Sequence, residues 1–313
     1  MPHRRGVLIP ALIVIPVGIG VGLAWAALGG EESAWHLALE PEGSWTLPYA
    51  EAPVLAAALS PGRLAVVPPD RQRVILFGGD ERREVDGFGM SEVSALATEP
   101  GRVWIAAGRS IYAIETEDLE VREWHGFDGG GEILAMTHAP GRLWLVHGEL
   151  GFAWLSVLAL NRGADPEPLG RIDLPSPQVS LHGLAGGGVL VQDRLAPYTL
   201  RKVDEDLSEA WAVVPEGAAM REFDPDPASW TVLAALPIAQ RGLVVQWFAD
   251  LRSTARAAVL LNVERGEVER VRIVDAPLGL IHAFEGGTRV LGAQEVPEGR
   301  ELVVFRVELA PEG

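Results

Sequence analysis

The sequence of 313 residues contains no cysteine. This absence excludes disulfide bonds, a lipid-modified N-terminal cysteine, thiolate metal sites and cysteine nucleophiles. Lysine is nearly absent as well, since Lys202 is the only one among 26 basic residues, and we interpret the excess of arginine as coding bias. The formal net charge is −17, so the surface repels phosphate backbones and nucleic acid is not expected as a partner.

Motifs of known enzymes are also missing. The sequence has no Gly-x-Ser-x-Gly elbow and no His-Glu-x-x-His pair. Its two glycine runs, at 129–131 and 186–188, lack the Lys-Ser/Thr of a phosphate-binding loop and are expected in turns between strands. The acidic residues Glu222, Asp224 and Asp226 alternate with proline, and we interpret them as a solvated loop, with a weak calcium site or a partner contact as the alternative.

The chain does contain an internal repeat. The turn Pro61–Leu64 recurs as Pro100–Val103 and as Pro140–Leu143, each time between two apolar runs. Including looser copies, the turn glycines lie at 62, 101, 141, 187, 242 and 287, at intervals of 39, 40, 46, 55 and 45 residues. The second repeat shows four apolar runs, at Val93–Ala97, Val103–Ala106, Ile111–Ile114 and Leu119–Trp124. A period near 40 with four strands in each repeat is typical of the blades of a β-propeller.

We predict an all-β propeller of six blades, and the alternative is seven, if the long fourth interval contains a degenerate repeat. The sixth repeat lacks its last strand, whereas a spare strand at Trp45–Leu47 precedes the first repeat. Pairing of this strand with Leu302–Leu309 would close the ring without a free edge. The pattern resembles the six-bladed propellers of the NHL type over residues 44–313, and the resemblance extends to the architecture alone.

The N-terminal segment is predicted to be a membrane anchor. No charged residue lies between Arg5 and Glu31, and the apolar run at residues 7–29 is long enough to cross a bilayer. A signal peptide cleaved near Ala24–Ala26 is the alternative, but the run is longer than the usual signal core. Because basic residues precede the run and acidic residues follow it, we expect residues 1–6 in the cytoplasm, a tether at 30–43, and the propeller outside a bacterial inner membrane.

Three kinds of residue are candidates for function. Gly18 and Gly22 are spaced four apart in the membrane segment, where they allow another helix to approach closely, although glycine is common in such helices. His138, His182 and His282 each fall on or just after an innermost strand, so they form a possible channel site. Local packing is the alternative for these histidines, because no metal-ligand spacing supports convergence.

Asparagine and tryptophan add two further arguments. The only two asparagines, Asn161 and Asn262, lie beside expected outer strands, which argues against the channel calcium site of lactonase-type propellers. Of the ten tryptophans, Trp104, Trp144 and Trp247 are expected between blades, on second strands. Trp124 and Trp211 fall on outer strands and are the possible interface residues, since tryptophan often carries binding energy.

These observations predict a function without a cofactor or a catalytic group. The preferred hypothesis is a non-enzymatic, membrane-anchored propeller that acts as a scaffold or accessory subunit of a larger bacterial membrane complex, of the respiratory, photosynthetic, secretion or envelope-assembly kind. One alternative is a channel-ligand or metal-dependent hydrolase propeller that uses His182 and His282. Another is a sensor of a small solute in the envelope.

Overall fold

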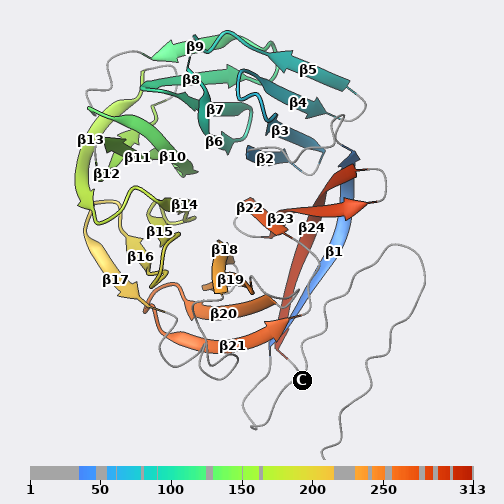
Figure 1. The fold of residues 1–313 in the computed structure, drawn as a ribbon, viewed down its shortest axis with the longest axis vertical. Coiled ribbons are helices and arrows are strands. Elements are labelled where there is room, and N and C mark those ends of the chain that lie inside the picture. Colours follow the sequence, from blue (N-terminus) through green and yellow to red (C-terminus); the bar gives the residue numbers. More distant parts are fainter. Residues whose placement is uncertain are drawn as a thin grey trace, which may run out of the picture.

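The described part of the chain forms six four-stranded antiparallel sheets arranged in a ring, which is the expected six-bladed propeller (Figure 1). The computed structural model describes residues 35–46, 55–60, 62–78, 81–89, 91–124, 130–149, 151–161, 165–214, 230–238, 242–250, 256–274, 279–284, 288–296 and 299–311. The predicted membrane segment with Gly18 and Gly22, and the acidic loop at 222–226, lie outside these residues. Within them, no helix has the length and apolar character needed to cross a membrane.

Each sheet is one blade, and its strands follow the chain from the centre of the ring outward. Blade 1 consists of β2 (Leu55–Ser60), β3 (Arg63–Val67), β4 (Val74–Gly78) and β5 (Glu81–Val85). Blade 2 consists of β6 (Val93–Glu99), β7 (Arg102–Ala107), β8 (Ser110–Glu115) and β9 (Val121–Trp124). Blade 3 consists of β10 (Glu132–Ala139), β11 (Arg142–Glu149), β12 (Phe152–Ala159) and β13 (Glu167–Leu174). Blades 4 and 5 consist of β14 (Val179–Gly183), β15 (Val189–Asp193), β16 (Leu200–Val203) and β17 (Glu209–Val213); and β18 (Trp230–Ile238), β19 (Leu243–Asp250), β20 (Arg256–Asn262) and β21 (Val268–Val274). Blade 6 combines β22 (Gly279–Phe284), β23 (Arg289–Val296) and β24 (Gly299–Pro311) with the first strand, β1 (Trp35–Thr46).

Burial falls from the second strand of a blade to its rim. Four consecutive residues of β3 and all five of β15 are buried, whereas most of β5, β9 and β17 is exposed. The second strands are near-continuous apolar runs because both of their faces lie against neighbouring blades. The outermost strands contact a neighbour on fewer sides, and accordingly carry charged residues.

The hydrophobic core is divided into clusters that lie between consecutive blades. One cluster joins blades 2 and 3 through Trp104 and Leu143, and the next joins blades 3 and 4 through Trp144 and Val189. The predicted position between blades is confirmed for Trp104 and Trp144, and Trp247 is likewise buried, on the second strand of blade 5. Burial of one such large apolar side chain contributes about 1.5 to 3 kcal/mol, so the blades depend on their neighbours for stability.

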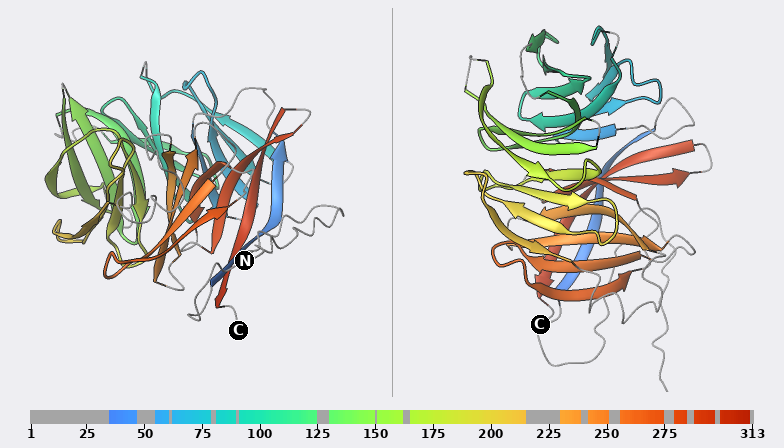
Figure 2. Two further views of the ribbon diagram at one scale, coloured as in Figure 1. Left: turned by 60° about the horizontal axis from the view of Figure 1, so that its bottom comes forward. Right: turned by 60° about the vertical axis from the view of Figure 1, so that its left-hand side comes forward.

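The ring is closed by the first strand, as the sequence predicts. β1 pairs with β24 in antiparallel register, from Trp35 opposite Pro311 to Thr46 opposite Glu301, and forms the outermost strand of blade 6. Charged side chains support this pairing, because Nε of Arg289 in β23 lies 2.6 Å from Oε2 of Glu42 in β1. Figure 2 shows β1 and β24 side by side along the rim.

β1 is longer than the predicted strand and begins at Trp35, within the stretch predicted to be a tether. The sequence suggested a break at Pro41 and Gly43. The register instead shifts between these two residues, which identifies a β-bulge that absorbs them. The last ladder pair between β23 and β24 is Arg289 with Arg306, whereas the pairing of β24 with β1 continues to Trp35 opposite Pro311.

Candidate functional site

A pocket of about 850 Å³ opens at the centre of one face of the ring. Its walls include Pro100, Pro140, Gly186 and Gly242, which belong to turns between innermost and second strands, so we call this side the turn face. Blades 1 to 5 all contribute to the lining in the described part of the chain. The pocket therefore lies where the repeated turns converge, at the mouth of the central channel.

Glu99 occupies one wall of the pocket because it is the last residue of β6, directly before the Pro100–Gly101 turn. Its Oε1 atom accepts hydrogen bonds from Nε1 of Trp104 at 3.0 Å and from Nη1 of Arg102 at 3.2 Å. The side chain is 21% exposed. These donors stabilise the ionised carboxylate and hold it against the edge of the pocket.

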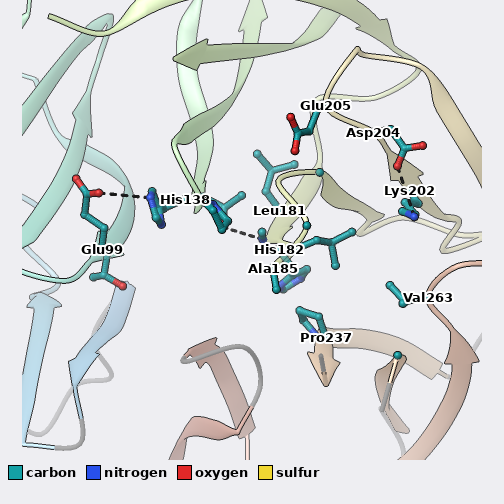
Figure 3. A pocket seen from close by; sticks show the side chains of 18 of the residues that line it. Glu99, His138, Leu181, His182, Ala185, Lys202, Asp204, Glu205, Pro237 and Val263 are labelled. Carbon is teal, nitrogen blue, oxygen red and sulfur yellow. Dashed lines mark hydrogen bonds and ion pairs between the residues drawn. The ribbon is translucent and has the colours of Figure 1, made fainter. Parts of the chain in front are cut away.

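His138 faces the same carboxylate from blade 3. Its Nε2 atom lies 3.4 Å from Oε2 of Glu99, and its side chain is 18% exposed (Figure 3). Burial lowers the pKa of His138 below its usual value, and the charge of Glu99 opposes this shift. The lowered pKa favours the neutral imidazole, whose Nε2 atom faces the carboxylate.

His182 lines the pocket from blade 4. Its Nε2 atom lies 3.4 Å from the backbone nitrogen of Ala235, which donates to it from blade 5, and 3.4 Å from Oγ of Ser180. His138 and His182 thus line the same pocket, and a channel site that uses them stays a prediction. The backbone of His282 belongs to β22, the innermost strand of blade 6, but its side chain lies outside the described residues.

The opposite wall contains Lys202, the only lysine of the sequence. Its Nζ atom lies 3.1 Å from Oε2 of Glu264 and 3.5 Å from Oδ1 of Asp204. The side chain is only 12% exposed, whereas those of Asp204 and Glu264 are 46% and 75% exposed. Figure 3 shows Lys202 and Asp204 across the pocket from His138 and Glu99.

Two further carboxylates stand beside Lys202, in the turn between β16 and β17. Oε2 of Glu205 lies 2.7 Å from Nη2 of Arg142 in blade 3. Asp206 accepts hydrogen bonds from the hydroxyl and the backbone nitrogen of Ser208, which lower the pKa of Asp206. With Asp204, Glu205, Asp206 and Glu264 around the single ammonium of Lys202, this wall carries more acidic than basic side chains.

The described residues contain no group of three or more His, Cys, Asp or Glu side chains that could hold a metal ion. The pocket contains instead a carboxylate–imidazole pair, a partly buried lysine beside exposed carboxylates, and apolar surface. Leu59, Leu181, Pro237 and Val263 supply much of that apolar surface. A cavity of this size, mainly apolar with a few convergent polar groups, is typical of a ligand-binding site.

The two predicted interface tryptophans pack partly against neighbouring blades. Trp124 lies 5.2 Å from the ring of Trp104, and its Nε1 atom donates to Asp165 of blade 3 at 2.6 Å. Trp211 donates to the carbonyl of Val263 in blade 5 at 2.9 Å. Both rings are partly exposed, so a contact with a partner stays a prediction for them.

Because Gly148 follows it, His147 is expected in a turn from the sequence, but the structure places it within β11. It is 1% exposed and stacks on Trp154 with 5.9 Å between the ring centroids. Burial lowers the pKa of His147 to about 4, against the effect of a backbone hydrogen bond with Gly131. The glycine that follows it is a strand residue.

The carboxylates and the lysine of the pocket were missed by the sequence reasoning. Glu99 directly precedes a repeated turn, and Asp204, Glu205 and Glu264 lie in turns between third and outermost strands. Their positions in the repeat could have indicated the pocket, because equivalent turns of a propeller lie on the same face. The rarity of lysine was a second signal.

The fold and the pocket together define a β-propeller with a cavity at the centre of one face. Neither a protein-family model nor a curated protein sequence matches the chain. Among solved structures, it is similar to a chain of the crystal structure of the mitotic checkpoint complex, with 12% identity and a TM-score of 0.57, over 93% of this chain and 88% of that chain. It is also similar to a catalytically inactive virginiamycin B lyase from Staphylococcus aureus crystallised with quinupristin, with 12% identity and a TM-score of 0.54, over 91% and 94% of the two chains. At this identity the likeness shows the fold alone.

Proposed function

We propose that this protein is a membrane-anchored, non-enzymatic propeller that acts as a scaffold or accessory subunit of a larger bacterial membrane complex. The observation that carries the proposal is the way β1 joins the ring. The strand that follows the predicted anchor is hydrogen-bonded to β24 along its whole length and closes the propeller. An anchor attached in this manner holds the disc in one orientation.

The start of β1 determines which face lies toward the anchor. The backbone nitrogen of Val307 in β24 donates to the carbonyl of Thr288, in the turn between β22 and β23, at 2.8 Å. Trp35 pairs with Pro311, four residues further along, so β1 begins on the side of the turn face. Five residues lie between residue 29 and Trp35, and the six steps from one Cα atom to the next span at most about 22 Å. The pocket would thus face the membrane, within reach of the membrane-embedded part of a partner.

Membrane attachment is tested by fractionation of the tagged full-length chain in a bacterial host. We expect the protein in the membrane pellet after carbonate washing, and a chain without residues 1–29, exported by a cleavable signal, in the soluble fraction. Purification in mild detergent should then yield a stoichiometric complex that survives size-exclusion chromatography. Recovery of the full-length protein alone and monomeric would contradict the role as a subunit.

A second candidate function is that of an enzyme or solute-binding propeller, as the alternative predictions state. The Glu99–His138 pair favours it, because a neutral imidazole held by a carboxylate is able to accept a proton from a bound molecule. The similarity in fold to a lyase is compatible with this role, but it supports only the fold. Elemental analysis tests the metal-dependent form: a stoichiometric metal that is lost in His182→Ala would favour the hydrolase over the scaffold.

A further inference from the structure

We propose that the pocket of the turn face binds an extended protein segment that presents arginine or lysine side chains. The inference rests on the proposed function, since it names the chemistry by which a partner would be recognised there. It comes from the pattern of charge and exposure on the pocket walls. Nothing in the fold of a propeller requires this pattern.

The carboxylates of the pocket outnumber its cations. Five carboxylates line it, from Glu99, Asp204, Glu205, Asp206 and Glu264, against the single ammonium of Lys202. Arg102 and Arg142 stand behind the wall and pair with two of these carboxylates, which still leaves five anions to three cations. The net charge of −17 adds a long-range field of the same sign.

Exposure separates the two signs of charge. Lys202 and Arg142 are 12% and 22% exposed, whereas their partners Glu264 and Glu205 are 75% and 50% exposed. The cationic side chains are therefore less accessible than the carboxylates, which face a ligand that enters the pocket. An arriving guanidinium or ammonium can bind oxygen lone pairs that these partly buried cations leave open, because each carboxylate accepts about four hydrogen bonds.

The apolar part of the lining fits the remainder of such a ligand. Leu59, Leu181, Pro237 and Val263 offer surface for the methylene groups of long basic side chains, which bury their stems and keep the charge at a polar rim. A volume of about 850 Å³ accommodates more than one such side chain. An anionic segment, a phosphate group or nucleic acid would meet repulsion from the same walls.

The proposal is tested with the full-length protein in detergent and two blocked pentapeptides. One alternates leucine with arginine, and the other has glutamine in place of arginine. We expect calorimetry to detect binding of the arginine peptide that weakens with added salt, and at least roughly tenfold weaker binding of the glutamine peptide. In the double variant Glu205→Gln and Glu264→Gln, we expect a similar loss of affinity for the arginine peptide.

The matched control is Glu92→Gln, which removes an exposed carboxylate before the start of β6, on the other face of the ring. It should bind the arginine peptide as the native chain does. Equal affinity for both peptides, no detectable binding, or a double variant that keeps its affinity would overturn the proposal. Tighter binding of the free polyamine spermidine than of the arginine peptide would also overturn the proposal, because the pocket would then be a site for small amines.

Failure of this inference is distinguishable from failure of the proposed function. If a stable membrane complex is purified but contains the double variant as readily as the native chain, the scaffold role stands and the charge-based recognition is wrong. If the arginine peptide binds as expected but no membrane complex is found, the charge-based recognition stands and the scaffold role is wrong. Unchanged thermal unfolding of the double variant shows that a loss of affinity is not a loss of fold.

Discussion

Single polar side chains link neighbouring blades from blade 1 to blade 5. The indole of Trp144 donates to the carbonyl of Gly187 at 3.1 Å, and the hydroxyl of Thr98 donates to the carbonyl of Ala58 at 3.0 Å. Gln246 of blade 5 donates to Gln192 of blade 4, and both side chains are fully buried. A buried polar group without a partner costs about 1 to 3 kcal/mol, so these links favour one alignment of the blades.

His147 should make the stability of the fold depend on pH. Its pKa is about 4 in the folded protein and near 6.5 in the unfolded chain. The unfolded chain therefore binds the proton first as the pH falls, and stability is lost between pH 6.5 and 4. We expect this residue to account for about 3 kcal/mol of the free energy of unfolding over that window.

The measurement compares denaturant unfolding of the native chain and of His147→Phe at pH 7, 5.5 and 4. The variant keeps an aromatic ring against Trp154, and any constant cost of the substitution cancels when the pH slopes are compared. The native chain should lose more stability than the variant on acidification. Parallel curves for the two proteins would show that His147 does not carry the effect.

Gly183 is a second residue on which the packing of blades depends. A Cβ atom at this position would lie 1.9 Å from the carbonyl oxygen of His138, in the neighbouring blade. We expect Gly183→Ala to destabilise the protein by roughly 3 kcal/mol, because backbone rather than a flexible side chain must move. Gly186→Ala is the control, since nothing lies within 4 Å of a Cβ there. Similar unfolding midpoints for both variants would refute this account.

At the scale of the element, the repeated turn is a small hydrogen-bonded unit. The carbonyl of Gly141 accepts from the backbone nitrogen of Leu160 at 2.9 Å, and Gly101 accepts from Thr116 in the same way. In blades 2, 3 and 5 the turn between the first two strands is thereby tied to the residue that follows the third strand.

Gly141→Ala should cost roughly 1 kcal/mol of stability. The residue has a φ of +71°, and nothing lies within 4 Å of a Cβ placed on it, so the cost comes from the backbone conformation alone. Gly62 holds the equivalent place in blade 1, also has open space around it, and does not have a positive φ. Gly62→Ala should thus leave the unfolding midpoint unchanged. A matching loss in both variants would show that some other property of the turn is responsible.

Sequence reasoning located most of these elements because turns and apolar runs alternate with a regular period. The strand runs predicted for blade 2 lie within two residues of β6 to β9. It misread two places where a turn-forming residue lies inside a strand: Pro41 in β1, at an edge that tolerates a bulge, and Gly148 after His147 in β11. In both cases pairing with a neighbouring strand overrode the local preference.

The pocket was less predictable than the strands. His138 and His182 could be placed near the channel, since each lies at the end of an innermost strand. Glu99, Lys202 and Glu264 come from three different blades, and their exposure depends on how the turns of those blades converge. The period of the sequence repeat predicts the number of blades. Which side chains meet at the centre depends on the three-dimensional arrangement of the closed ring.

At the scale of the whole molecule, stability is shared between neighbours. Each hydrophobic cluster of the described residues contains side chains from two adjacent blades, and one of them joins blade 1 to β23 and β24 of blade 6. No blade buries its faces alone, so a ring that opens at one point exposes two apolar surfaces. The junction at β1 and β24 is where the two ends of the chain meet, and its failure would open the ring.

Removal of the first strand should therefore affect the whole ring, whereas removal of the residues before it should not. We expect a chain without residues 1–34 to unfold at the same temperature as the full-length protein, since β1 begins at Trp35. A chain without residues 1–46 loses the partner of β24 and the ion pair between Arg289 and Glu42. Its unfolding midpoint should fall by at least about 10 °C, and the bare edge of β24 should promote association. Calorimetry and light scattering measure both effects, and equal midpoints for the two shortened chains would mean that β1 does not hold the ring closed.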